Sequence, residues 1–97
     1  MQTFLISYDI SNNRLRLKVT KWLLKAGLYR IQYSVFMGTP GHSALKKLKK
    51  ELNQLTTDKD WSKEDSIFLL PLHQYTKNEL EIIGKTATEW PLIYREL

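Results

Sequence analysis

The sequence predicts an α+β fold in which an antiparallel sheet carries two helices on one face, in the order βαββαβ. Two stretches, residues 14–26 and 43–55, have apolar side chains at helical spacing, and short β-favouring runs surround them. The 97 residues contain no internal repeat, low-complexity tract or Ser/Gly-rich linker. The chain is therefore expected to fold as a single domain over residues 1–97.

A strand that leads into a helix is expected near the N-terminus. Residues 3–8 are apolar and β-favouring, and residues 11–13, Ser-Asn-Asn, can accept hydrogen bonds from the free N–H groups of a first helical turn. The predicted helix covers residues 14–26, and Gly27 supplies its C-terminal stop. The apolar residues on its buried face are Leu15, Val19, Trp22, Leu23 and Ala26.

The alternation that follows predicts one strand with a polar face over residues 28–37. One face carries Tyr29, Ile31, Tyr33, Val35 and Met37. The other, polar face carries Arg30, Gln32, Ser34 and Phe36. Residues 38–41, Gly-Thr-Pro-Gly, are typical of a turn, and helical spacing resumes over residues 43–55. A second amphipathic helix is therefore expected there.

Two further strands are predicted in the second half of the chain. One covers residues 66–70, where Pro71 should end it, and the other covers residues 80–84. Residues 85–97 include the apolar run Trp-Pro-Leu-Ile-Tyr, and we expect them to form an extra C-terminal strand that pairs with a sheet edge in a dimer. Together the elements predict a ferredoxin-like sandwich whose open sheet face needs a partner.

Basic charge is concentrated in one half of the chain. Residues 1–50 hold ten Lys and Arg against one acid, and residues 51–97 hold five against nine, which gives the net charge of +5. This asymmetry suggests a basic surface for nucleic acid, although solvated helix faces are the alternative. The sequence has no cysteine, no basic leader and no apolar run that approaches the ~20 residues of a membrane span. We therefore expect a cytoplasmic protein without a membrane partner.

Asp9 is the candidate for chemistry. It is the sole acid of residues 1–50 and follows the first predicted strand, where irregular backbone can direct a side chain toward a ligand. A carboxylate there can bind Mg²⁺, which keeps several waters and needs few protein ligands. A symmetric dimer would bring two such carboxylates to one ion. The alternative is an aspartate that bonds the backbone of its own turn.

Several basic residues are candidates for contact with nucleic acid. On a helical wheel one stripe contains Arg14, Lys18, Lys21 and Lys25. This stripe could contact phosphates, or it could be the solvated face of an amphipathic helix. Arg16 lies roughly opposite the stripe, at the margin of the apolar face, and could pair with an acid or a phosphate near Asp9.

Three residues of the predicted strands are further candidates. Arg30, on the polar face of its strand, could meet nucleic acid or a second subunit. Tyr8 and Phe36 could stack on bases as exposed aromatic rings do, but packing in the core or in a dimer is the commoner fate of such rings.

Several segments resemble a known family. They are Tyr-Asp-Ile at residues 8–10, Arg-Leu-Arg-Leu-Lys-Val at 14–19, and Gly-Leu-Tyr-Arg-Ile-Gln-Tyr-Ser-Val-Phe-Met-Gly at 27–38. Residues 65–72 and 82–84 also match the positions of that family's later strands. The chain is similar, over nearly its whole length, to the small CRISPR-associated endoribonucleases of the spacer-acquisition machinery.

The resemblance implies a ferredoxin-like homodimer that joins the CRISPR integrase subunit and binds duplex DNA. It also implies a metal-dependent nuclease activity, in which Asp9 binds the metal across the dimer axis. The family's other site positions match Tyr8, Arg16, Arg30 and Phe36 in this sequence. Where some members have an arginine, this chain has Lys18, which keeps the charge but loses the bidentate fork.

The mechanism that the resemblance implies is metal-assisted phosphodiester hydrolysis. Mg²⁺ held by two copies of Asp9 would activate water, and Arg16 or Arg30 would stabilise the developing charge. The substrate stays open among RNA, single-stranded DNA and duplex DNA. A catalytically silent DNA-binding scaffold, an RNA-recognition module and a ribonuclease toxin of similar fold are the alternatives. The RNA-recognition module is disfavoured, because residues 66–70 lack its Lys/Arg-Gly-aromatic motif.

Overall fold

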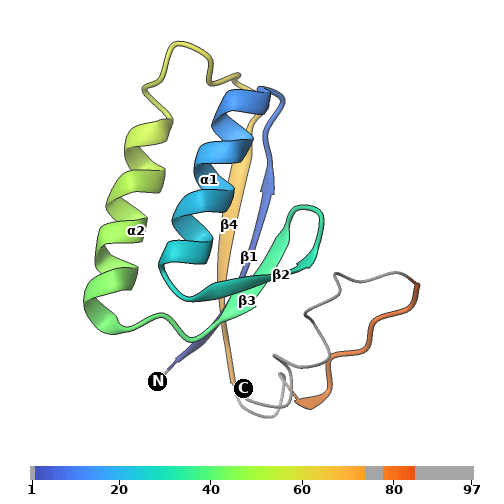
Figure 1. The fold of residues 1–97 in the computed structure, drawn as a ribbon. Coiled ribbons are helices and arrows are strands. Elements are labelled where there is room, and N and C mark those ends of the chain that lie inside the picture. Colours follow the sequence, from blue (N-terminus) through green and yellow to red (C-terminus); the bar gives the residue numbers. More distant parts are fainter. Residues whose placement is uncertain (1, 74–77, 85–97) are drawn as a thin grey trace.

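The computed structural model of the chain describes residues 2–73 and 78–84, and its elements follow the predicted order βαββαβ (Figure 1). In chain order they are β1 (Thr3–Asp9), α1 (Asn13–Lys25), β2 (Leu28–Gln32), β3 (Val35–Gly38), α2 (His42–Leu55) and β4 (Ser66–Leu72). The α+β class and both predicted helices are confirmed. None of the helices in the described ranges is long and apolar enough to cross a bilayer.

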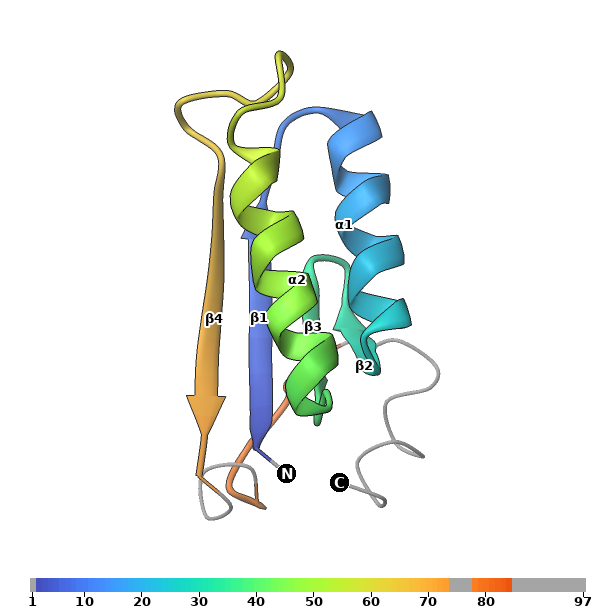
Figure 2. The same ribbon diagram turned by 90° about the vertical axis from the view of Figure 1, so that its left-hand side faces the viewer.

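The sheet has the order β2-β3-β1-β4, and each neighbouring pair is antiparallel. Both helices lie on one face of it, as the view turned by 90° shows (Figure 2). Side chains alternate along β1, so that Phe4, Ile6 and Tyr8 join the helices in the main core. Ser7 and Asp9 therefore belong to the opposite, open face of the sheet.

The single strand predicted over residues 28–37 is wrong, because the structure forms a hairpin there. β2 and β3 are joined by a turn at Tyr33 and Ser34, and the register shifts between Arg30 and Gln32. The turn contains no glycine, proline or asparagine, so the sequence carries no strong signal for it. Pairing of β3 with β1 places this reversal, and a backbone bond from Tyr8 N to Ser34 O at 3.1 Å closes it.

The strand predicted at residues 80–84 is also wrong, since those residues are not in a strand. Taken literally, the predicted ranges placed one strand between the two helices and two after the second helix. The hairpin restores the ferredoxin-like order. Leu80 and Ile82 instead pack against a small apolar cluster of Ile31, Met37 and Leu72.

β4 extends through Pro71 to Leu72 rather than ending at the proline. Proline is tolerated because β4 is an edge of the described sheet, where one side of the backbone needs no partner strand. The extra C-terminal strand predicted within residues 85–97 lies outside the described residues.

The helices pack their predicted apolar faces onto the sheet. Fully or almost fully buried positions are Leu15, Val19 and Leu23 on α1 and Leu48, Leu52 and Leu55 on α2. The end of β3 lies so close to the start of β2 that a Cβ at Gly38 would stand 2.6 Å from the carbonyl oxygen of Gly27 and 2.8 Å from Leu28 Cα. This close approach requires glycine at position 38.

Candidate metal site at the end of the first strand

Asp9 is the last residue of β1 and is exposed on the open face of the sheet. Its two neighbours, Tyr8 and Ile10, are buried in the main core, with exposed fractions of 5% and 3%. Asp9 stands opposite Ser66 in the last pair between β1 and β4. Its carboxylate has no hydrogen-bond or ion-pair partner among the described residues. The backbone on both sides of Asp9 is thus anchored while its carboxylate is free for a ligand.

The turn after Asp9 is fixed by Arg16. Its Nη1 donates to the carbonyl oxygens of Ile10 and Ser11, both at 3.0 Å, and its Nη2 donates to Asn13 Oδ1 at 3.1 Å. Nε is buried without a partner in the described part of the chain. Of the five guanidinium N–H donors, only one on Nη2 stays available to a ligand. The geometry supports a role for Arg16 in holding the turn more than in stabilising charge on a phosphate.

Asp65 holds the same turn from the opposite side. Its Oδ1 accepts hydrogen bonds from Ser11 N at 3.0 Å and Ser11 Oγ at 3.2 Å, and its Oδ2 accepts from Ser62 N at 2.9 Å. The hydrogen bond from the Ser62 backbone, followed by those from Ser11, lowers the pKa of the Asp65 carboxyl. Asp65 therefore stays ionised and acts as an acceptor.

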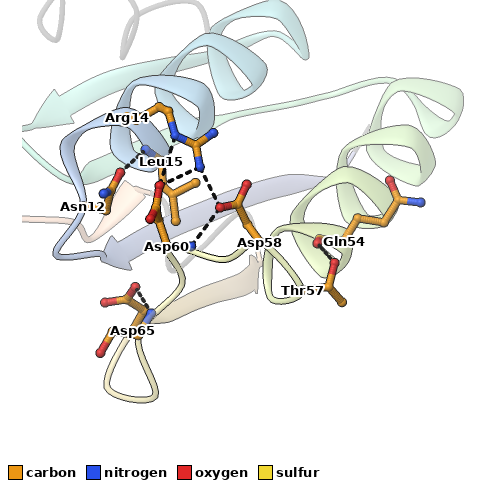
Figure 3. Close-up of polar contacts among 9 residues, drawn as sticks. Asn12, Arg14, Leu15, Gln54, Thr57, Asp58, Asp60 and Asp65 are labelled. Carbon is orange, nitrogen blue, oxygen red and sulfur yellow. Dashed lines mark hydrogen bonds and ion pairs between the residues drawn. The ribbon is translucent and has the colours of Figure 1, made fainter.

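Arg14 was predicted to contact nucleic acid, but it binds two aspartates of the same loop (Figure 3). Its Nη2 lies 2.6 Å from Asp58 Oδ1 and 2.9 Å from Asp60 Oδ2. The hydrogen bonds that Arg14 donates to Asp60 and Asp58 raise the pKa of the guanidinium. The pKa of Asp58 is lowered, first by the backbone N–H of Asp60 and then by Arg14. These contacts tie the loop to the first turn of α1, so Arg14 is less available to phosphate.

Tyr8, Arg30 and Phe36 come together beneath α1. Thr20 Oγ1 bonds Tyr8 OH at 2.9 Å and accepts from Arg30 Nη2 at 3.1 Å. The Tyr8 and Phe36 rings are stacked with centroids 6.2 Å apart, and the Arg30 guanidinium lies 5.1 Å from the centre of the Phe36 ring and 5.7 Å from that of Tyr33.

Base stacking by Tyr8 or Phe36 does not fit this arrangement. Phe36 is completely buried and Tyr8 is 5% exposed, because both side chains face the helices. The packing alternative describes both rings better, and the cluster links β1, α1 and the hairpin.

The remaining predicted residues of the basic stripe, Lys18, Lys21 and Lys25, are exposed on α1. Four further lysines are exposed on α2, namely Lys46, Lys47, Lys49 and Lys50. Both helices cover the face of the sheet opposite to the one that carries Asp9 (Figure 2). The lysine stripe and the free carboxylate therefore lie on different sides of the sheet.

The donor set fits a hard divalent ion only in part. Asp9 offers a free carboxylate of the kind that Mg²⁺ prefers. No cluster of three or more His, Cys, Asp or Glu able to hold a metal occurs within residues 2–73 and 78–84. One chain therefore supplies half of a plausible site, and a second carboxylate would complete it.

Sequence reasoning missed Thr20, Ser11 and Asp65. The bonds between Asp65 and Ser11 span 54 positions, and no local spacing indicates a contact over that distance. Thr20 could have been noticed as a hydroxyl beside the apolar stripe of α1, since a hydroxyl at such a position usually finds a partner.

Comparison with known proteins identifies the family. The family described as CRISPR associated protein Cas2 matches residues 1–79. A protein of Archaeoglobus fulgidus named CRISPR-associated endoribonuclease Cas2 1 is 33% identical over 85 residues, which are 88% of this chain and 86% of that one. A protein of Synechocystis named CRISPR-associated endoribonuclease Cas2 3 is 35% identical over 91 residues, 94% of each chain.

Solved structures share the fold. The crystal structure of Streptococcus pyogenes Cas2 at pH 6.5 superposes with a TM-score of 0.65 at 28% identity and covers 84% of this chain and 99% of that one. A hypothetical protein from Thermus thermophilus has a TM-score of 0.68 at 23% identity over 89% of this chain and 94% of that one, a likeness of fold alone. The sequence match and the ferredoxin-like architecture agree, and this chain belongs to the Cas2 family of CRISPR-associated proteins.

Proposed function

We propose that this protein is a homodimeric, nucleic-acid-binding nuclease in which two copies of Asp9 hold one Mg²⁺ ion. The observation that carries the proposal is the free Asp9 carboxylate on a sheet face that also bears uncovered apolar side chains. The relatives named endoribonucleases support hydrolysis of a phosphodiester bond, with RNA as the first substrate to test.

The apolar part of that face favours a second copy as the partner. Phe68 and Leu70 on β4 stand opposite Ser7 and Leu5 in register and are 66% and 52% exposed. Full burial of an exposed Phe or Leu side chain is worth about 1.5–3 kcal/mol, so covering the half to two thirds that is still exposed is worth about 1–2 kcal/mol for each. In a two-fold interface each patch meets its own copy, so a residue near the axis meets itself. We propose that the axis runs close to Asp9, which lies on the same face two residues beyond Ser7.

The residues of this chain would divide the work of hydrolysis as follows. Asp9 would bind the metal, which when bound would activate water and neutralise charge on the scissile phosphate. Arg16 would hold the turn that carries Asp9, through its bonds to Ile10 and Ser11. Arg30 would brace the hairpin through Thr20. This division differs from the sequence-based hypothesis, in which Arg16 or Arg30 stabilised the developing charge directly.

A second function, a DNA-binding scaffold that joins the CRISPR integrase in spacer acquisition, is favoured by the position of the lysines. A duplex held along α1 would lie on the side of the sheet away from Asp9 (Figure 2). Phosphate contact there needs no catalysis and is sensitive to salt. One dimer could perform both functions on its two sides.

Cleavage assays on single-stranded RNA, single-stranded DNA and duplex DNA, with and without Mg²⁺, test the nuclease. Asp9→Asn should abolish Mg²⁺-dependent cleavage, while Glu51→Gln, a matched change of charge on α2, should leave it intact. Equal cleavage by wild type and Asp9→Asn would refute the assignment of Asp9.

The scaffold has a separate test in duplex binding. The double variant Lys21→Ala/Lys25→Ala should bind duplex DNA more weakly, with a salt slope shallower by about 2. The matched double variant Lys59→Ala/Lys63→Ala, in the loop between α2 and β4, should bind like wild type. If both doubles weaken binding equally, the α1 stripe is not the DNA surface.

A further inference from the structure

Two side chains from different parts of the chain form hydrogen bonds with the turn that follows Asp9. Arg16 holds its carbonyl groups, and Asp65 holds the N–H and hydroxyl of Ser11. We infer that Asp65 is a positioning residue for the Asp9 carboxylate, an inference that rests on the proposed metal site.

The end of the β1–β4 ladder explains why this position needs a side chain. The last backbone pair joins Asp9 to Ser66, and beyond it the chain turns away toward α1. The N–H of Ser11 then has no strand partner, and an unpaired backbone donor is unfavourable. Asp65, the residue before Ser66, places its Oδ1 where it accepts this N–H at 3.0 Å. The Asp65 carboxylate thus takes the place of a backbone acceptor just beyond the end of the β1–β4 ladder.

Asp65 can hold the turn firmly because its own loop is fixed. Its second oxygen accepts from Ser62 N at 2.9 Å, inside the loop. The loop is attached to α1 by the contacts of Arg14 with Asp58 and Asp60 (Figure 3). The loop that carries Asp65 is therefore itself attached to α1, the helix that follows the turn.

Asp9 is thereby held on both sides. On the N-terminal side the Tyr8 ring is buried and its hydroxyl bonds Thr20. On the C-terminal side the core contact of Ile10 is supplemented by the Asp65 and Arg16 contacts. Loss of Asp65 would loosen the second side alone. Partners that orient metal ligands typically change metal affinity by 10–100-fold, and for this indirect one we expect about tenfold.

The test compares Asp65→Ala with Asp65→Asn. The control is Glu64→Gln, at an exposed carboxylate one residue away whose side chain has no hydrogen-bond or ion-pair partner among the described residues. Mn²⁺ binding is measured by calorimetry on full-length protein, and amide exchange at Ser11 is measured by NMR. Asp65→Ala should weaken Mn²⁺ binding about tenfold and speed exchange at Ser11. Asp65→Asn, which keeps one oxygen for Ser11, should fall between it and wild type, and Glu64→Gln should match wild type.

Unchanged Mn²⁺ affinity in Asp65→Ala, in a protein where Asp9→Asn abolishes binding, would overturn the inference. Equal losses in Asp65→Ala and Glu64→Gln would overturn it too, since a general charge effect would then suffice. If Asp9→Asn leaves Mn²⁺ binding intact, the proposed metal site fails instead. NMR relaxation of the Asp9 amide then decides: greater mobility in Asp65→Ala supports positioning, and unchanged mobility refutes it. Should Asp65→Ala not fold, Asp65→Asn carries the same comparisons.

Discussion

Substitution of Phe36 distinguishes two roles for this ring, contact with nucleic acid and packing in the core. Its ring is completely buried, stacks with Tyr8 and lies under the Arg30 guanidinium. Phe36→Ala would remove the ring from the main core and is expected to destabilise the protein by about 3–5 kcal/mol. A domain of this size has a total stability of about 5–15 kcal/mol. We therefore expect Phe36→Ala to be barely folded and Phe36→Leu, a smaller loss of volume, to fold.

Thermal and urea unfolding at one protein concentration would measure both variants, since the proposed dimer would make stability depend on concentration. Each 1 kcal/mol should lower Tm by roughly 4–8 °C in a domain of this length. Phe36→Leu should bind nucleic acid and cleave it, per folded molecule, as wild type does. A Phe36→Leu protein of wild-type stability that binds nucleic acid several-fold more weakly would refute the reasoning, because the ring would then contact the ligand.

Three other perturbations follow from single contacts. Thr20→Val should cost about 1–3 kcal/mol in urea unfolding, because both hydrogen bonds of its hydroxyl are lost while the buried Tyr8 and the half-buried Arg30 stay in place. Gly38→Ala should cost at least about 1–3 kcal/mol, because its Cβ would overlap backbone atoms, whereas Gly41→Ala has open space and should be near neutral. The lowered pKa of Asp65 predicts a contribution to stability that is complete above its ordinary value of 3.8 and is lost as the pH falls below it. In Asp65→Asn the free energy of unfolding should fall less steeply as the pH is lowered through this range. The same pH dependence as in wild type would contradict the prediction.

Local patterns predicted the helices well. The spacing of Leu15, Val19 and Leu23 located α1, and Asn12 caps it as expected, accepting from Leu15 N at 3.1 Å. Such signals succeed because helix formation depends on neighbours within one or two turns. The placement of Asp9 at a strand end also followed from local sequence.

Long-range pairing explains what the sequence did not predict. The hairpin turn at Tyr33 and Ser34 is set by the pairing of β3 with β1, so alternation alone extended one strand through it. Arg14 was predicted to face phosphate because its partners, Asp58 and Asp60, are more than 40 positions away. Phe36 was assigned to a polar face on the same alternation, which the register shift in the hairpin breaks.

The account depends most on the claim that two copies of Asp9 share one metal ion on the open sheet face. The stoichiometry of Mn²⁺ binding, measured by calorimetric titration of the purified protein with Asp9→Asn as control, tests it most directly. The account predicts one ion for two chains and no such binding in Asp9→Asn. One ion bound to each chain, or binding that survives Asp9→Asn, would contradict it.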